Sequence, residues 1–413
     1  MLVISFILFI TCYFFCFSKQ KILILGISIL VFTITFLYGI FGAYFFTTTP
    51  KFHINAWILS CGLLYFYFYF FSFLFLSRFG FSGLLLHSLV MVCISFIKII
   101  FPLHPFILLY PYAERFLPAT ESTFINLFML FFLSGVLFCR CNLSSRIACF
   151  VFLFIFFSIS NVQVKESEKT DIKIAIIQIG LYFEKGGSTT KFFGELMSFL
   201  KLHPEVNAIV FSENNFFSYK TEYNQKMSEK LLSDIEQNRL HHDFHLFLSF
   251  SGYRDFNNII TLYQFDNIRK LNQKKTLIPF IEKPGLFNSP STLTSEFYSV
   301  DKLHRNTIFN IMNNSVSTYI CYDALFPDAY DKPSDIVLIQ SNYALLDKGY
   351  GFERLQHIAT FLAKFINGLQ SKIVINIQNT GGTVVISNGW RIDNNIYEMS
   401  KTEPFFIIDT SEL

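Results

Sequence analysis

Apolar positions are divided unevenly between the two halves of this chain. Up to about residue 162 they form nearly continuous runs, whereas from residue 172 they form short runs separated by polar and amphipathic stretches. A transmembrane helix needs about 20 apolar residues to cross roughly 30 Å of hydrocarbon. The pattern therefore predicts an N-terminal polytopic all-α membrane domain over 1–162, a polar linker over 163–171 and an α/β domain over 172–413.

We interpret the apolar half as about six transmembrane helices, with five or seven left open because the first and the last two runs are short. The runs are 2–18, 22–47, 54–77, 79–101, 124–139 and 146–162. The first run lacks a basic start and a small-residue cleavage site, which favours a span over a cleaved signal peptide. Lys and Arg in the short loops favour an outside N-terminus, which places the α/β domain outside the cytoplasm.

The polar half has the pattern of a layered α/β domain, because short runs rich in Ile and Val alternate with amphipathic stretches. The predicted strands are 172–179, 207–213, 245–252, 258–265, 316–322, 335–341, 372–378 and 383–387. The predicted helices are 189–202, 223–238 and 351–368.

Composition narrows the class of protein further. Of the 413 residues, 52% are hydrophobic and 15% charged, which agrees with a membrane domain. The formal net charge of +3 and the lack of a basic stripe predict no nucleic-acid partner. Seven of the eight cysteines lie in or beside apolar runs, so the α/β half has one cysteine, Cys321, and no disulfide framework.

Three polar residues of the α/β half suggest acyl-transfer chemistry. Glu213 ends a predicted strand, Lys274 opens the segment Lys274–Glu282, and Cys321 lies near the end of another predicted strand. A thiol attacks a carbonyl carbon as its thiolate, and a carboxylate can accept its proton as a general base. An ammonium and a backbone N–H, here that of Tyr322, can stabilise the resulting oxyanion.

Two other clusters could suggest metal sites, but their patterns favour other interpretations. Cys139 and Cys141 form a C-x-C pair with no further Cys or His cluster nearby. His241, His242 and His245 lie where a predicted helix passes into a strand, so their side chains are expected to diverge. We therefore expect no metal, and nothing in the sequence indicates a cofactor.

The order of these motifs resembles the nitrilase (carbon–nitrogen hydrolase) superfamily. The motifs are a strand-ending Glu213, a Lys274 segment of the form Lys-x-x-Leu-Ile-Pro-Phe-x-Glu that ends at Glu282, and Cys321-Tyr-Asp followed by Phe-Pro. With the apolar N-terminal half, the chain most resembles the apolipoprotein N-acyltransferase family. That resemblance covers nearly the whole chain and implies a nitrilase-like αββα sandwich behind the membrane domain.

The resemblance also implies roles for individual residues. Cys321 would be the acylated nucleophile, Glu213 the general base and Lys274 the oxyanion stabiliser. Supporting residues would be Glu282 as a second required carboxylate, and Tyr322 and Asp323 on the positions of the family's Tyr and Glu after the nucleophile.

The family reaction moves a fatty acyl group from a phospholipid, through a cysteine thioester, to the N-terminal amine of a diacylglyceryl-modified lipoprotein. The implied location is the bacterial inner membrane, with the catalytic domain facing the periplasm. Two alternatives stay open at this point. One is an acyltransferase-like protein of a conjugation system, resembling conjugal transfer protein TraB, and the other is a membrane-tethered amidase or hydrolase with a different acceptor.

Overall fold

The computed structural model divides the chain into two compact units, one formed by 1–165 and 325–331 and the other by 166–324 and 332–413. The residues that the structure describes are 54–97, 120, 122–138, 144, 147–149, 151–152, 155, 170–214, 216–239, 243–253, 258–266, 268–278, 282–283, 298, 300, 308–326, 333–343, 355–369, 371–387 and 390–413.

The first unit contains a helical hairpin joined by a third helix. Its described elements are α3 (Ile54–Leu76), the 3-10 turn η1 (Ser77–Phe79), α4 (Gly80–Ser95) and α6 (Thr123–Phe138). Helices α3 and α4 are antiparallel, because Tyr65 hydrogen-bonds to Ser95 at one end and Ser72 contacts His87 (2.7 Å) nearer the turn. Tyr69 of α3 hydrogen-bonds to Ser134 of α6 (2.8 Å).

The hairpin turn depends on a glycine. A Cβ built on Gly83 would lie 1.8 Å from the carbonyl oxygen of Leu76, so a larger residue would force the two helices apart. Apart from Arg78 in the turn, the three helices and their connecting turn contain no Asp, Glu, Lys or Arg. Buried hydroxyl and imidazole pairs are therefore the polar contacts available to join otherwise apolar helices.

The described residues test the predicted spans in part. The predicted spans 54–77, 79–101 and 124–139 are helical over most of their length, as α3, α4 and α6. One helical stretch of the described chain, Tyr67–Ser95, is long and apolar enough to cross a membrane, and it includes the turn between α3 and α4. The spans 2–18 and 22–47 lie outside the described residues, as does most of 146–162, and the polytopic membrane domain stays a prediction.

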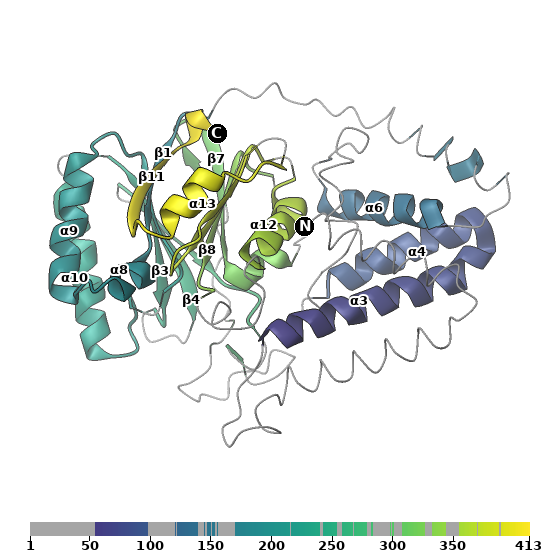
Figure 1. Ribbon diagram of the computed structural model, residues 1–413, viewed down its shortest axis with the longest axis horizontal. Coiled ribbons are helices and arrows are strands. Elements are labelled where there is room, and N and C mark those ends of the chain that lie inside the picture. Colours follow the sequence, from purple (N-terminus) through teal and green to yellow (C-terminus); the bar gives the residue numbers. More distant parts are fainter. Residues whose placement is uncertain are drawn as a thin grey trace, which may run out of the picture. The chain divides into compact units, whose positions relative to one another are not determined.

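The second unit contains two sheets among its described residues (Figure 1). The first sheet has the order β11 (Phe405–Asp409), β1 (Lys173–Ile177), β2 (Ala208–Phe211), β3 (His245–Ser251), β4 (Ile259–Phe265) and β5 (Ile268–Gln273). The second sheet has the order β10 (Val384–Ile386), β9 (Ile373–Gln378), β8 (Ile336–Ser341), β7 (Asn314–Ile320) and β6 (Ile308–Ile311).

Alternation along the strands builds a four-layer sandwich. In β1, Ile174 and Ile176 pack against the second sheet, whereas Ala175 and Ile177 pack under the helices on the other face. Because successive strand residues point to opposite faces, a central strand with apolar residues throughout is buried on both sides. The layers are helices, first sheet, second sheet and helices, which is the predicted αββα arrangement.

Amphipathic helices cover both outer faces (Figure 1). Helix α9 (Thr189–Leu202) packs Phe192, Leu196 and Leu200 on the first sheet, at the i, i+4, i+8 spacing of one helix face. The same core includes residues of α8 (Ile179–Glu184) and α10 (Glu222–Arg239). Helices α12 (Leu355–Asn367) and α13 (Asn394–Ser400) lie on the second sheet, against β9 and β10.

The strands that the sequence did not predict lie at sheet edges. Strands β5 and β11 flank the first sheet, and β6 flanks the second. Strand β5 begins with exposed Ile268 and Arg269, and β11 alternates between buried and half-buried positions. Strands β5 and β6 include charged or polar residues, which at a sheet edge discourage pairing with another chain, whereas β11 has four apolar residues followed by Asp409.

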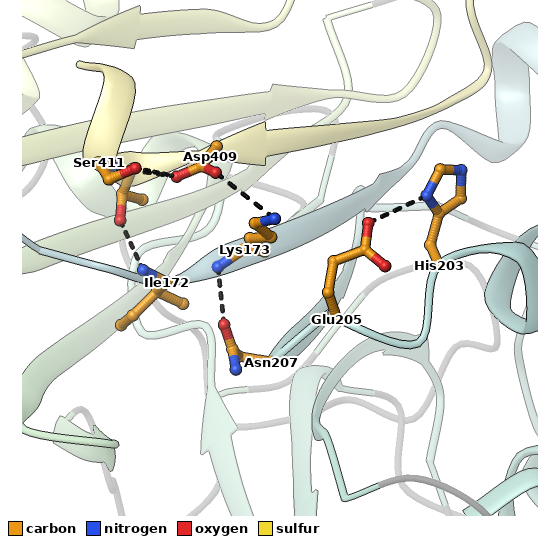
Figure 2. A network of polar contacts seen from close by, with 8 residues as sticks. Ile172, Lys173, His203, Glu205, Asn207, Asp409 and Ser411 are labelled. Carbon is orange, nitrogen blue, oxygen red and sulfur yellow. Dashed lines mark hydrogen bonds and ion pairs between the residues drawn. The ribbon is translucent and has the colours of Figure 1, made fainter.

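The first strand is held at its start by both neighbours in the sheet. Figure 2 shows Lys173 donating its backbone N–H to Asn207 Oδ1 (2.8 Å) while its ammonium lies 3.8 Å from a carboxylate oxygen of Asp409. The N–H of Ile172 donates to Thr410 Oγ1 (2.9 Å). These contacts join the beginning of the α/β unit to its C-terminal strand.

Removing a core side chain from the sandwich is expected to destabilise it. Leu338 is fully buried between the sheets, so Leu338→Ala should cost about 2–5 kcal/mol through lost burial and a residual cavity. For a unit of this size that corresponds to a fall of roughly 4–20 °C in the unfolding midpoint. Circular dichroism of the full chain on heating measures it. Ile268→Ala, at a residue 53% exposed, serves as the control, and an equal fall there would contradict the assigned core.

Candidate active site

Strand directions bring the predicted site residues to one edge of the sandwich. Glu213 follows β2 by two residues, and Lys274 directly follows β5. Strand β4 is antiparallel to both β3 and β5, and β3 is parallel to β2, so β2 and β5 run the same way. Their carboxyl ends therefore meet at the same edge, and the two side chains leave the sheet there.

Lys274 is the centre of a buried ion cluster. Its ammonium Nζ lies 3.0 Å from Glu213 Oε1 and 2.7 Å from Glu282 Oε1. The lysine side chain is 0% exposed, and each carboxylate side chain is 10% exposed. The other carboxylate oxygen of Glu282 accepts the N–H of Ile278 (2.8 Å). Glu282 therefore holds the ammonium with one carboxylate oxygen and the backbone of Ile278 with the other.

Cys321 directly follows strand β7 and has a strained backbone conformation. Its φ is +48°, in the left-handed region that costs a non-glycine residue about 1–3 kcal/mol. The residue begins the 3-10 turn η2 (Cys321–Leu325) and is 3% exposed. Its thiol also accepts a hydrogen bond from the backbone N–H of Asn342, which follows the neighbouring parallel strand β8. The sharp turn therefore directs the thiol toward the edge where β8 ends.

The charges of the cluster act on one another through a buried environment. Burial opposes the charge of Lys274, but the carboxylates of Glu213 and Glu282 outweigh it and raise the pKa of Lys274 well above its ordinary value. Burial raises the pKa of Glu282 despite the adjacent ammonium. Burial and the Glu213 carboxylate raise the pKa of the Cys321 thiol, against the opposing influence of Lys274.

These pKa shifts define the resting state of the site. The thiol is protonated and the lysine is charged at neutral pH, so a nucleophilic sulfur requires proton transfer during the attack. Glu213, whose charge acts on the thiol, is the carboxylate that the sequence analysis expects as the base. The ammonium and the carboxylates together can hold a proton and a developing oxyanion within one water-poor site.

The two residues after the nucleophile, Tyr322 and Asp323, are both buried. Asp323 is 3% exposed, and its Oδ1 accepts the N–H of Thr276 (3.0 Å), so it joins the nucleophile turn to the Lys274 segment. Tyr322 is also buried, and its backbone N–H lies in the turn that begins at the nucleophile. Asp323 therefore has a structural contact in addition to its position in the motif.

The sequence analysis assigned no role to Asn342 or Tyr343. Asn342 supplies the backbone N–H to the thiol, and Tyr343 is buried close enough to Cys321 for the two groups to influence one another. Burial, with the neighbouring charges of Cys321 and Glu213, raises the pKa of Tyr343. The available signal was position, because both residues directly follow the predicted strand 335–341, parallel to the strand of the nucleophile.

The structure describes only part of the histidine cluster and neither cysteine of the C-x-C pair. His245 Nδ1 contacts Tyr263 Oη (2.8 Å), and its ring stacks on Phe265 with centroids 3.9 Å apart. His241, His242, Cys139 and Cys141 lie outside the described residues. Within the described part of the chain, no three His, Cys, Asp or Glu side chains gather in a way that would hold a metal ion.

No protein-family model matches the sequence, and no curated protein matches it. Solved structures do show similarity. A variant of the Nesterenkonia AN1 amidase from the nitrilase superfamily has 13% identity and a TM-score of 0.40, over 59% of this chain and 92% of that one. A carbon–nitrogen hydrolase from Helicobacter pylori G27 has 14% identity and a TM-score of 0.37, over 58% and 90%.

Saccharomyces cerevisiae Nit3, a member of branch 10 of the nitrilase superfamily, has 11% identity and a TM-score of 0.34, over 57% of this chain and 94% of that one. The likeness is thus to structures of the nitrilase superfamily. The interpretation of the site rests on its geometry.

Removing the central ammonium should destabilise the fold in a pH-dependent way. Lys274→Met leaves two buried carboxylates without a cation, at a cost of about 3–5 kcal/mol near pH 7. Because the pKa of Glu282 is raised in the folded state, acidification should restore part of that loss as the carboxyl takes up its proton. Thermal unfolding of the full chain across a pH series measures both effects.

The wild type should also lose stability as pH rises, but only at alkaline pH, where Lys274 itself loses its proton. The raised pKa of Lys274 gives a stabilising contribution that is complete below the ordinary lysine pKa of about 10.4 and lost as pH rises through the raised value. Lys226→Met breaks an exposed pair with Glu222 and serves as the control. Equal stability of Lys274→Met and Lys226→Met at every pH would contradict the cluster.

Titration of the thiol tests the charge environment separately. Alkylation of Cys321 by iodoacetamide should keep rising beyond the ordinary thiol pKa of about 8.5. Glu213→Gln removes a negative charge that raises the thiol pKa, so the rise should shift to lower pH. Mass spectrometry of the Cys321 peptide gives the rate, with the exposed Glu229→Gln as control. An ordinary thiol titration in the wild type would show that the charges do not reach the sulfur.

Proposed function

We propose that this chain is a membrane-bound acyltransferase that carries a fatty acyl group as a thioester on Cys321. The observation that supports the proposal most is the buried Lys274 ammonium held by Glu213 and Glu282 in electrostatic contact with a buried, strained cysteine. Perturbed ionisable groups gathered around a nucleophile are typical of functional sites. The proposed activity places the enzyme among thiol-dependent acyl-transfer enzymes of nitrilase type.

In the first half-reaction, the Cys321 sulfur attacks the ester carbonyl carbon of a phospholipid while Glu213 accepts the thiol proton. Lys274 and the N–H of Tyr322 stabilise the tetrahedral oxyanion. Collapse of the intermediate breaks the carbon–oxygen bond of the ester, and the departing alkoxide takes the proton from Glu213. The products are a lysophospholipid and an acyl thioester on Cys321.

In the second half-reaction, an amine attacks the thioester carbonyl and transfers a proton to Glu213. The carbon–sulfur bond breaks, the amide product leaves, and the thiolate recovers the proton from Glu213. The carboxylate thus acts as base and then as acid in each half, so no net proton is gained or lost by the enzyme. Glu282 holds the ammonium in place, because its own carboxylate is fixed by Lys274 and Ile278.

A lipid donor is favoured by the apolar unit of the same chain. Helices α3, α4 and α6 contain no Asp, Glu, Lys or Arg, and their connecting turn contains one such residue, Arg78. An anchor that confines the enzyme to a membrane raises the local concentration of phospholipid and of lipid-modified acceptors. The proposed location is the bacterial inner membrane, with the catalytic unit facing the periplasm.

An amine acceptor is favoured over water by the low exposure of the nucleophile. Cys321 is 3% exposed and Lys274 is fully buried, and exclusion of water protects a reactive acyl intermediate from hydrolysis. By the resemblance of its motifs to the apolipoprotein N-acyltransferase family, the proposed acceptor is the N-terminal amine of a diacylglyceryl-modified lipoprotein.

The purified full chain should acylate a lipopeptide in phospholipid vesicles. A phospholipid with an isotopically labelled acyl chain and a synthetic diacylglyceryl-cysteine peptide should give an N-acylated peptide, detected by mass spectrometry. Cys321→Ala should reduce product by at least about 10⁴-fold, because covalent catalysis is lost. Cys61→Ala, at another buried cysteine, should keep wild-type activity.

Other outcomes of these experiments would contradict the proposed activity or support the proposed acceptor. Free labelled fatty acid without acylated peptide, dependent on Cys321, would contradict the transferase proposal and identify a hydrolase. Equal product from wild type and Cys321→Ala would remove the catalytic proposal. Restoration of a bacterium depleted of its lipoprotein N-acyltransferase, by wild type and not by Cys321→Ala, would support the acceptor. Failure of both in that bacterium would count against a lipoprotein acceptor and favour the conjugation-type alternative.

A further inference from the structure

The interface between the two sheets is apolar except at the edge that holds the site. Its core consists of side chains such as Ile176, Val210, Leu338 and Ile375. Near the carboxyl ends of the strands, two buried amide side chains replace this apolar packing, Gln340 of β8 and Asn272 of β5. Burying an amide is unfavourable unless it is hydrogen-bonded, so the partners of these two residues are informative.

Gln340 joins the second sheet to three strands of the first. Its Nε2 donates to the carbonyl oxygen of Phe211 in β2 (2.6 Å) and more weakly to that of Phe247 in β3 (3.4 Å). Its Oε1 accepts a hydrogen bond from the hydroxyl of Thr261 in β4. The residue is 0% exposed. Both ends of the amide are therefore used in contacts across the interface.

Asn272 makes the corresponding contact in the other direction. It belongs to the first sheet, and its Nδ2 donates to the carbonyl oxygen (2.9 Å) and the hydroxyl (3.0 Å) of Thr318 in β7. Asn272 is 1% exposed and Thr318 is 0% exposed. The amide therefore fixes β5 to β7 across the sheet interface.

Each of these contacts involves residues that lie two or three positions before a residue of the site in the sequence. Phe211 precedes Glu213 by two residues, and Asn272 precedes Lys274 by two. Gln340 precedes Asn342, the donor to the thiol, by two residues, and Thr318 precedes Cys321 by three. The strands that carry the base, the ammonium, the thiol and its N–H donor are thus joined in pairs across the interface.

We propose that Gln340 and Asn272 are positioning residues that fix the register of the two sheets at the active-site edge. Glu213 and Lys274 follow strands of the first sheet, whereas Cys321 follows a strand of the second. The distances from Glu213 and Lys274 to the Cys321 sulfur therefore depend on how the two sheets are aligned. The inference rests on the proposed function, because it assigns the two amides a role in that chemistry.

Aliphatic packing alone does not define this register sharply. The hydrophobic effect is non-directional, so Ile, Leu and Val side chains tolerate small shifts of one sheet over the other. An amide hydrogen bond is directional, and loss of a partner leaves a buried carbonyl or hydroxyl unsatisfied. Proton transfer requires heavy atoms within about 3 Å, so a shift of about 1 Å can slow the reaction as much as about 100-fold.

Two further hydrogen bonds join the sheets along the same edge. Ser212 donates its hydroxyl to Asn379 Oδ1 (2.9 Å), which joins the end of β2 to the turn after β9. Thr383 donates its hydroxyl to Gln178 Oε1 (3.0 Å), which joins the start of β10 to the end of β1. The polar contacts thus concentrate where the site requires a fixed geometry.

Isosteric variants test the proposal in the full chain. Gln340→Met and Asn272→Leu keep side chains of similar length and shape and remove the hydrogen bonds. Gln264→Met is the matched control, because Gln264 is a buried glutamine at the other end of β4 with its own contacts to Glu236 and Arg269. Melting temperature, lipopeptide acylation and the rate of iodoacetamide modification at Cys321 are measured for all three.

We expect kcat for acylation to fall at least about 10-fold in Gln340→Met and Asn272→Leu, with KM within about twofold of wild type, because base and sulfur are misplaced. The Cys321 modification rate near neutral pH should change at least about threefold in both variants, because the N–H and charges that surround the sulfur shift. Gln264→Met should lower the melting temperature comparably and leave kcat and the modification rate unchanged.

Unchanged kcat and modification rate in both folded variants would overturn the proposal, as would equal losses in Gln264→Met. Modification of Cys321 needs no substrate, so it reports on positioning even if wild-type acyltransferase activity is absent. In that case a changed modification rate would support the positioning role while the proposed function fails. If Cys321 is modified at the wild-type rate in both variants, the positioning role is contradicted as well.

Discussion

The site depends on keeping one ammonium charged in a place from which water is excluded. Lys274 has no exposed surface, and an isolated buried ammonium would lose its proton. Two carboxylates at 3.0 and 2.7 Å reverse that tendency and raise the pKa of the lysine. Because the cluster has two acids for one base, it also holds the adjacent thiol in its protonated form. The arrangement thus keeps a carboxylate base and an ammonium that can stabilise an oxyanion beside a thiol that is uncharged before the reaction.

The fold supplies this arrangement through strand direction and chain turns. Glu213, Lys274 and Cys321 are far apart in sequence, yet each follows a strand whose carboxyl end lies at the same edge of the sandwich. The positive φ of Cys321 turns the chain sharply at that edge. The two-sheet interface below the site changes there from aliphatic packing to buried amides. Stability and geometry are therefore provided by different contacts.

Sequence reasoning was most reliable where a pattern had one physical cause. Helix α9 was predicted at its observed bounds because its apolar spacing fits one helix face, and the central strands were predicted because both of their faces are buried. The edge strand β5 was missed, since its Ile-Arg-Lys-Leu start has no apolar run. Missing β5 also hid Asn272, while Gln340 stood visibly at the end of a buried run without an interpretation. The motifs predicted Glu213, Lys274 and Glu282 as members of one site, but no pattern in the sequence reports which pairs of atoms touch.

The acyl-enzyme is the species on which the whole account depends. The most direct measurement is the mass of the Cys321 peptide after the full chain is incubated with phospholipid and no acceptor. The account predicts an added acyl chain on Cys321 that hydroxylamine removes, with stoichiometric release of lysophospholipid. An unmodified Cys321 peptide, or an acyl chain found only on another residue, would contradict it.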